Sequence, residues 1–147
     1  MSGSPDPEVF EVSVTDTWAA LEKQPTSVLV DVRTQAEWTY VGVPDLSRFG
    51  RQVMFAEWLT FPSNAVDPHF VERLSTAVTN GGGGPQTEIF FLCRSGVRSL
   101  AAARAMAAAG YQRCRNVSGG FEGGLNDARH RGQVSGWKAA NLPWVQG

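Results

Sequence analysis

Cysteine, histidine and long apolar segments are scarce in this sequence, and each scarcity excludes a class of protein. The 147 residues include two cysteines and two histidines, which excludes a disulfide framework and leaves no His/Cys cluster with metal-site spacing. No window approaches the roughly 18 consecutive apolar residues that a membrane span needs. The first residues also lack the basic and apolar regions of a signal peptide. We therefore expect a soluble, cytoplasmic chain with reduced thiols, no metal and no membrane partner.

The sequence does contain enough apolar residues for one packed domain. Hydrophobic residues make up 42% of the chain and charged residues 18%, a composition that excludes a disordered protein. The length fits a single hydrophobic core. Residues 1–8 are rich in Pro, Gly and Ser and predict a flexible N-terminus. Residues 9–147 are then expected to form a single domain.

Charge is distributed unevenly along the chain. The net charge of -1 argues against a general nucleic-acid partner. Residues 1–88 carry 12 acidic and 5 basic residues, whereas residues 89–147 carry 2 acidic and 8 basic ones. Seven of those eight are Arg, whose planar guanidinium suits forked contacts with oxyanions. The basic half contains Cys93, although an ordinary solvated surface accounts for most of these cations.

Alternating strands and helices predict an α/β fold, with a parallel sheet covered by helices on both faces. The expected strands are 9–14, 27–33, 51–59, 87–93 and 115–117, and the expected helices are 16–23, 34–38, 68–79, 97–110 and 121–130. The run SVLVDVR is typical of a strand buried on both faces. Thr34 and Glu37 have the spacing of a helix capping box. Ligands of such sheets bind at the carboxyl ends of strands, where Cys93 is expected to lie.

Cys93 lies between a predicted strand and a predicted helix, in the segment CRSGVRS. Free amides of the first helical turn, the helix dipole, and the charges of Arg94 and Arg98 all favour a thiolate there. Such surroundings lower the pKa of a thiol well below the free value of about 8.5. We therefore expect Cys93 to be a nucleophile, the alternative being an inert core thiol. Cys114 has no such loop after it, so a packing role is expected and a resolving thiol is the alternative.

Three segments of the chain form a recognisable set: LVDVRTQAEW at 29–38, CRSGVRS at 93–99 and NVSGGFEGG at 116–124. Together they resemble a single-domain rhodanese, a thiosulfate:cyanide sulfurtransferase-like protein, over nearly the whole chain. The resemblance implies the rhodanese fold, a five-stranded parallel sheet flanked by helices on both faces. It also implies that Cys93 accepts a sulfane sulfur as a persulfide. The implied substrate-binding loop consists of Arg94, Ser95, Gly96, Val97, Arg98 and Ser99, and the implied structural supports are Asp31, Arg33 and Glu37.

The resemblance implies sulfur transfer in two half-reactions. The Cys93 thiolate takes sulfur from a small anionic donor, thiosulfate or a persulfide, and a thiophilic acceptor such as cyanide, a small thiol or a protein thiol then removes it. No metal or organic cofactor is needed.

Two alternatives stay open, a cysteine-dependent phosphatase or arsenate reductase, and a persulfide carrier without rapid turnover. Similar phosphatase loops place five residues between Cys and Arg, whereas four residues separate Cys93 from Arg98. The shorter loop favours a cradle for one sulfur atom.

Overall fold

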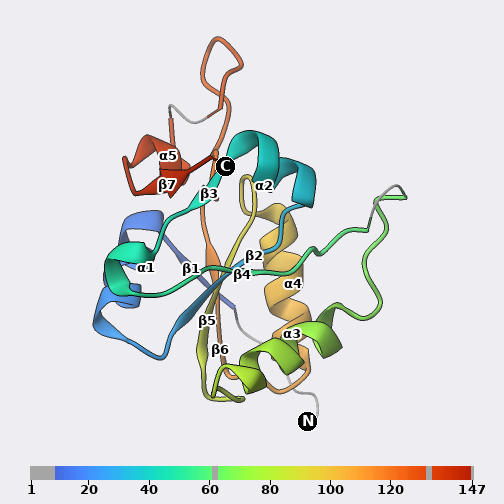
Figure 1. Cartoon of the computed structure of the whole chain (residues 1–147). Coiled ribbons are helices and arrows are strands. Elements are labelled where there is room, and N and C mark those ends of the chain that lie inside the picture. The colour runs from blue at the N-terminus through green and yellow to red at the C-terminus, as the bar shows by residue number, and fades with distance from the viewer. Residues whose placement is uncertain (1–8, 61–62, 132–133, 147) are drawn as a thin grey trace.

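The framework of the protein is a five-stranded parallel sheet, seen in a computed structural model that describes residues 9–60, 63–131 and 134–146 (Figure 1). The strands are β1 (Phe10–Val12), β2 (Val28–Asp31), β4 (Met54–Phe55), β5 (Glu88–Leu92) and β6 (Arg113–Val117). Their order is β1-β6-β5-β2-β4, and every neighbouring pair is parallel. The predicted α/β class with a five-stranded parallel sheet is confirmed. The predicted flexible segment 1–8 lies outside the described residues.

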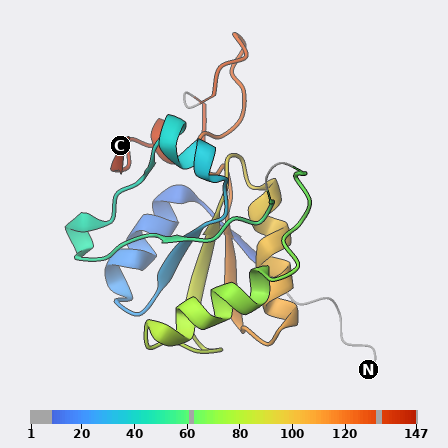
Figure 2. The ribbon, with the colours of Figure 1, turned by 45° about the vertical axis from the view of Figure 1, so that its right-hand side comes forward.

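Helices lie on both faces of this sheet (Figure 2). The helices of the described chain are α1 (Val14–Lys23), α2 (Gln35–Val41), the 3-10 helix η1 (Ser47–Phe49), α3 (Phe70–Asn80), α4 (Val97–Ala108) and α5 (Gly136–Ala139). One core cluster contains buried residues of α3 and α4, such as Leu74 and Met106. The other contains buried residues of α1 and α5, such as Leu21 and Trp137. A small antiparallel pair, β3 (Val43–Pro44) with β7 (Trp144–Val145), lies apart from the main sheet.

The central strand β5 shows why the sheet separates two cores. Ile89 and Phe91 belong to the cluster beside α3 and α4, while Phe90 and Leu92 belong to the opposite cluster. Successive side chains of a strand point to opposite faces, so a strand covered on both sides has to be apolar throughout. This requirement explains the uninterrupted apolar run, and it brings Cys93 to the carboxyl edge of the sheet.

Two predicted elements differ in the structure. The helix predicted over 121–130 is wrong, because that segment forms turns and the last helix is α5. Within the predicted segment, Gly123 and Arg129 have φ values of +73° and +63°, which are left-handed conformations that an α-helix cannot contain. The strand predicted over 51–59 is reduced to Met54–Phe55. This short piece pairs with β2 at Val30 and Asp31, and the amide of Ala56 after it also donates to Asp31 O.

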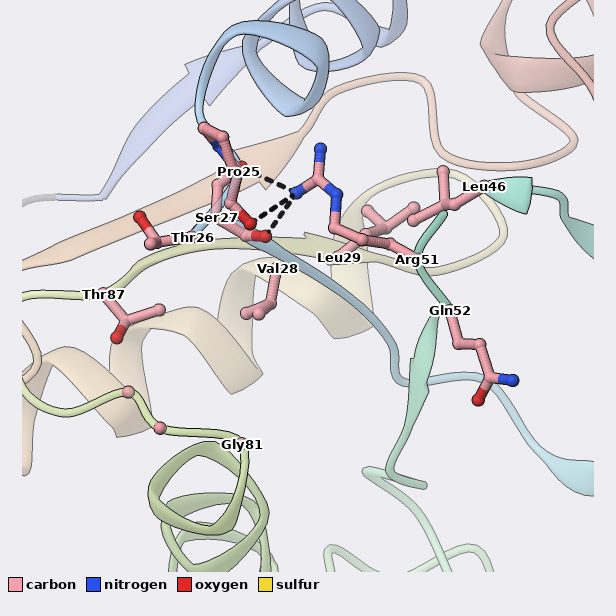
Figure 3. Close-up of a pocket in the computed structure, with 12 residues that line it drawn as sticks. Pro25, Thr26, Ser27, Val28, Leu29, Leu46, Arg51, Gln52, Gly81 and Thr87 are labelled. Carbon is pink, nitrogen blue, oxygen red and sulfur yellow. Dashed lines mark hydrogen bonds between the residues drawn. The ribbon is translucent and has the colours of Figure 1, made fainter. Parts of the chain in front are cut away.

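Arg51 joins distant segments at the amino ends of the strands (Figure 3). It lines a cavity of about 380 Å³ together with Thr87 and Val28, where β5 and β2 begin. Its Nη1 donates to the carbonyl oxygen of Ser27 at 2.7 Å and to that of Pro25 at 3.5 Å. Because its donors are directed at backbone carbonyls, Arg51 stabilises the turn before β2. This edge of the sheet is opposite the edge that carries Cys93.

Candidate active site

Cys93 follows β5 directly and is buried, with 1% of its surface exposed. Residues 94–96 connect it to α4, and the Gly96 that caps α4 has a φ of +110°, a conformation that favours glycine. The backbone amide of Gly96 donates to Cys93 Sγ with an N···S distance of 3.1 Å. The strand, turn and helix therefore direct an amide dipole at the sulfur atom.

A second glycine-rich turn holds the backbone of the Cys93 loop. Phe121 N donates to Cys93 O at 2.8 Å, and Gly123 N donates to Arg94 O at 3.0 Å. A Cβ at Gly120 would lie 2.6 Å from Cys93 O, so only glycine fits this close approach. The turns of the segment NVSGGFEGG thus hold the loop, and the bonds of Phe121 and Gly123 to it take the start of the predicted helix 121–130 out of helical conformation.

Arg98 makes its forked contact with Glu37. Arg98 Nη1 donates to Glu37 Oε1 at 2.7 Å and Nη2 donates to Oε2 at 2.8 Å. Burial alone would raise the pKa of Glu37, but hydrogen bonds from Arg98 and Thr34 and the charge of Arg98 outweigh it and lower this pKa to about 2. The hydrogen bond with Glu37 raises the pKa of Arg98 against the effect of burial, and the charges of Glu37 and Cys93 add to the rise. Arg98 therefore acts on the sulfur as a nearby charge, while both of its terminal nitrogens hold α2.

Asp31 and Arg33 form a buried pair beneath the site. Arg33 Nη2 lies 2.6 Å from Asp31 Oδ2 and also donates to Gly42 O at 2.8 Å. The guanidinium carbon is 4.3 Å from the centre of the Phe121 ring. These contacts join the end of β2 to the end of α2 and to the turn that holds the Cys93 loop. Such a position fits the supporting role that the sequence resemblance implied for the pair.

The remaining loop residues contribute in different ways. Val97 is 77% exposed. Ser95 is half-buried.

Ser99 is buried, and its Oγ lies 3.2 Å from Cys93 Sγ. The same oxygen lies 2.5 Å from Asn116 Oδ1 on β6, and Asn116 also contacts Glu11 on β1. Pairing of Phe91 with Asn116 and of Glu11 with Asn116 sets this arrangement, and sequence reasoning assigned Asn116 and Glu11 no role.

A cavity of about 620 Å³ opens beside the Cys93 loop. Its lining consists of Thr34, Glu37, Val41, Leu59, Asn64, Arg94, Arg98, Glu122 and Arg131. Three arginines and two glutamates leave a positive balance, which suits an anionic ligand. Sequence reasoning missed Arg131. The chain after β6 brings this residue back to the site, where its Nη1 donates to Gly123 O at 2.7 Å. Arg94 is exposed at the same mouth.

Cys114 lies apart from this site. It is buried, its Sγ lies 3.7 Å from Tyr111 O, and burial raises its pKa to about 11 against the smaller effect of Arg115. Cys114 pairs with Ile89 on β5, four residues before Cys93. At a rise of about 3.3 Å per residue, that spacing is about 13 Å, whereas a disulfide needs Cα atoms within about 7 Å. The geometry favours the packing role over the resolving thiol.

Neither a metal-binding cluster nor a membrane-spanning helix lies in the ranges that the structure describes. There, no group of three or more His, Cys, Asp or Glu side chains could hold a metal ion. In the same ranges, none of the helices has the length and apolar character required to cross a membrane.

A cysteine at the carboxyl edge of a five-stranded parallel sheet, followed by a tight loop and a helix, is an arrangement that fits a sulfurtransferase-type domain. The chain belongs to the rhodanese-like family, because residues 13–127 match the model of the Rhodanese-like domain. The resemblance drawn from the three sequence segments is confirmed.

Individual relatives agree with this assignment. The chain is 38% identical over 136 residues to the uncharacterized protein RP600 of Rickettsia prowazekii, covering 92% of this chain and 97% of that protein. It is 33% identical over 115 residues to thiosulfate sulfurtransferase 18 of Arabidopsis thaliana, covering 78% and 76% of the two chains. The crystal structure of Rv0390 from M. tuberculosis superposes with a TM-score of 0.81 and 41% identity, covering 95% of this chain and 98% of that one. Family and fold together support sulfurtransferase activity in general.

Proposed function

We propose that the chain is a sulfurtransferase that accepts a sulfane sulfur on Cys93 and passes it to a thiophilic acceptor. The observation that carries the proposal is the geometry of Cys93, whose Sγ accepts from the amide of Gly96 at 3.1 Å at the N-terminus of α4. An amide donor and a helix N-terminus stabilise negative charge on sulfur. The same groups can stabilise the terminal sulfur of a persulfide, which is also anionic.

The two half-reactions balance without a cofactor. The Cys93 thiolate attacks the outer sulfur of thiosulfate, a new S–S bond forms, and the old S–S bond breaks as sulfite leaves with the bonding electron pair. A nucleophilic acceptor then attacks the outer sulfur of the persulfide and restores the thiolate. With cyanide as acceptor the product is thiocyanate.

The surroundings of Cys93 favour a small anionic donor. Cys93 is 1% exposed, so a donor has to present a slender sulfane sulfur rather than a bulky group. Arg94 and Arg131 line the neighbouring cavity and would attract thiosulfate or an anionic persulfide. A small thiol or a protein thiol is the proposed acceptor in place of cyanide.

The position of Arg98 argues against the phosphatase alternative. A phosphatase of this kind needs the arginine of its loop to bind the equatorial oxygens of a phosphoryl group, but both terminal nitrogens of Arg98 hold Glu37. The short loop also leaves one amide contact on the sulfur, that of Gly96, rather than a wide ring for a tetrahedral ion.

A paired assay of thiocyanate formation and p-nitrophenyl phosphate cleavage tests the proposal. The parent and a Cys114→Ala control should form thiocyanate from thiosulfate and cyanide, Cys93→Ala should lose this activity, and no variant should cleave the phosphate ester. Phosphate cleavage that depends on Cys93, without thiocyanate formation, would establish the phosphatase instead. A stable persulfide with no turnover would establish the carrier.

A further inference from the structure

A row of hydrogen-bonded polar side chains leads away from Cys93, from Ser99 on α4 to Asn116 on β6 and Glu11 on β1. Ser99 Oγ lies 3.2 Å from Cys93 Sγ and 2.5 Å from Asn116 Oδ1. Asn116 Nδ2 lies 3.0 Å from both carboxylate oxygens of Glu11 and 3.0 Å from Gly96 O. Ser99 and Asn116 are buried, so their hydrogen bonds are not exchanged freely with water.

The acceptors around Asn116 fix the orientation of its side-chain amide. Its nitrogen carries two hydrogens, and two acceptors face it, the Glu11 carboxylate and the Gly96 carbonyl. Its oxygen therefore faces Ser99. An amide oxygen only accepts, so Ser99 has to donate its single hydroxyl proton across the 2.5 Å contact with Asn116.

Asn116 Oδ1 and Cys93 Sγ thus compete for the single hydroxyl proton of Ser99. While Ser99 donates to Asn116, its lone pairs face Cys93 Sγ and can accept only from a thiol S–H. When Cys93 loses its proton to solvent, its sulfur becomes an acceptor that faces the lone pairs of the Ser99 oxygen. The Ser99 hydroxyl can then turn and donate to the sulfur, which leaves Asn116 Oδ1 unpaired. A hydrogen bond to an ion is stronger than one between neutral groups, but leaving a buried acceptor unpaired opposes the change.

We propose that Asn116, oriented by Glu11, is a positioning residue that competes with Cys93 for the proton of Ser99 and so sets the pH at which Cys93 becomes nucleophilic. This inference rests on the proposed role of Cys93 in sulfur transfer. Persulfide formation moves the negative charge to the outer sulfur, after which the Ser99 hydroxyl returns to Asn116. The competition therefore favours the thiol before the donor arrives and releases the persulfide sulfur from Ser99 afterwards.

Charged groups lie on several elements around Cys93, and the charge of Cys93 acts on Arg98. Arg94 precedes α4, Arg98 of α4 is paired with Glu37 of α2, and the Asp31–Arg33 pair lies at the end of β2. Glu11 lies on β1. Substitutions that exchange only neutral groups leave all these charges in place, so they separate the hydrogen-bond competition from electrostatic effects.

The test is the rate of Cys93 alkylation by iodoacetamide, a neutral reagent, measured against pH. All variants carry Cys114→Ala, so that one thiol reacts. Asn116→Leu has nearly the shape of Asn but no acceptor, and it should lower the midpoint of the rate profile by about one pH unit, a roughly tenfold gain in reactivity below the midpoint. In a Ser99→Ala background the same substitution should leave the midpoint unchanged, because no proton is left to compete for.

An unchanged or raised midpoint in Asn116→Leu would overturn the proposal, and so would an equal fall with and without Ser99. If circular dichroism shows that Asn116→Leu does not fold, Glu11→Gln on the exposed edge strand replaces it. A change caused only by the lost charge of Glu11 would persist in the Ser99→Ala background, whereas the proposed effect would not. Alkylation needs no sulfur donor, so thiocyanate assays on the same variants show separately whether the proposed function fails.

Discussion

The ion pair between Glu37 and Arg98 should stabilise the folded protein far more than an ordinary surface pair. The two side chains are 20% and 21% exposed, and their forked contact has N···O distances of 2.7 and 2.8 Å. Glu37 also completes a capping box with Thr34 at the start of α2. Glu37→Gln is the informative perturbation, because glutamine has nearly the shape of a protonated glutamate and removes the charge together with one acceptor oxygen.

The magnitude follows from the pKa of Glu37, which is lowered from 4.5 to about 2. Each pKa unit corresponds to about 1.4 kcal/mol of preference for the charged form in the folded state. Glu37→Gln should therefore lower the free energy of unfolding by about 3 kcal/mol at pH 7. Because the folded-state pKa lies below the unfolded-state value, this stability is fully present above pH 4.5 and is lost as the pH falls toward 2. The stability curves of parent and variant should converge in acid.

Urea denaturation followed by circular dichroism at several pH values measures this difference directly. Glu72→Gln is the matched control, since the Glu72 side chain is 81% exposed and its removal should change stability by less than about 0.5 kcal/mol. A loss of less than about 1 kcal/mol in Glu37→Gln at pH 7 would refute the reasoning. A difference that does not shrink in acid would refute it as well.

Two further substitutions test the loop and the cavity. Gly120→Ala should lower the free energy of unfolding by more than Gly50→Ala, which should lose roughly 1–2 kcal/mol, because the two glycines have φ of +65° and +68° but only Gly120 lies against Cys93 O. Equal losses in urea denaturation would show that this close approach costs nothing. Arg131→Gln should raise the KM for thiosulfate about fivefold with little change in kcat, a loss of about 1 kcal/mol of uniform binding. The exposed Arg104→Gln should not change KM, and an equal rise in both variants would contradict a local role for Arg131.

The sequence was most informative for strands that are covered on both faces of the sheet, because their burial produces a local apolar pattern. Apolar runs identified β2 and β5, and the strand, turn and helix around Cys93 located the candidate site. The turns at Gly123 and Gly136 could not be predicted, because these glycines approach other backbone segments closely. The contact of Asn116 with Ser99 depends on the register of neighbouring strands, and the position of Arg131 depends on how a loop returns. Local composition contains neither piece of information.

Mass spectrometry of the purified protein after exposure to thiosulfate tests the central claim most directly. The account predicts one added sulfur atom on the peptide that contains Cys93, its removal by cyanide with formation of thiocyanate, and no addition to the peptide that contains Cys114. An unmodified Cys93 peptide, or sulfur found on Cys114 instead, would contradict it.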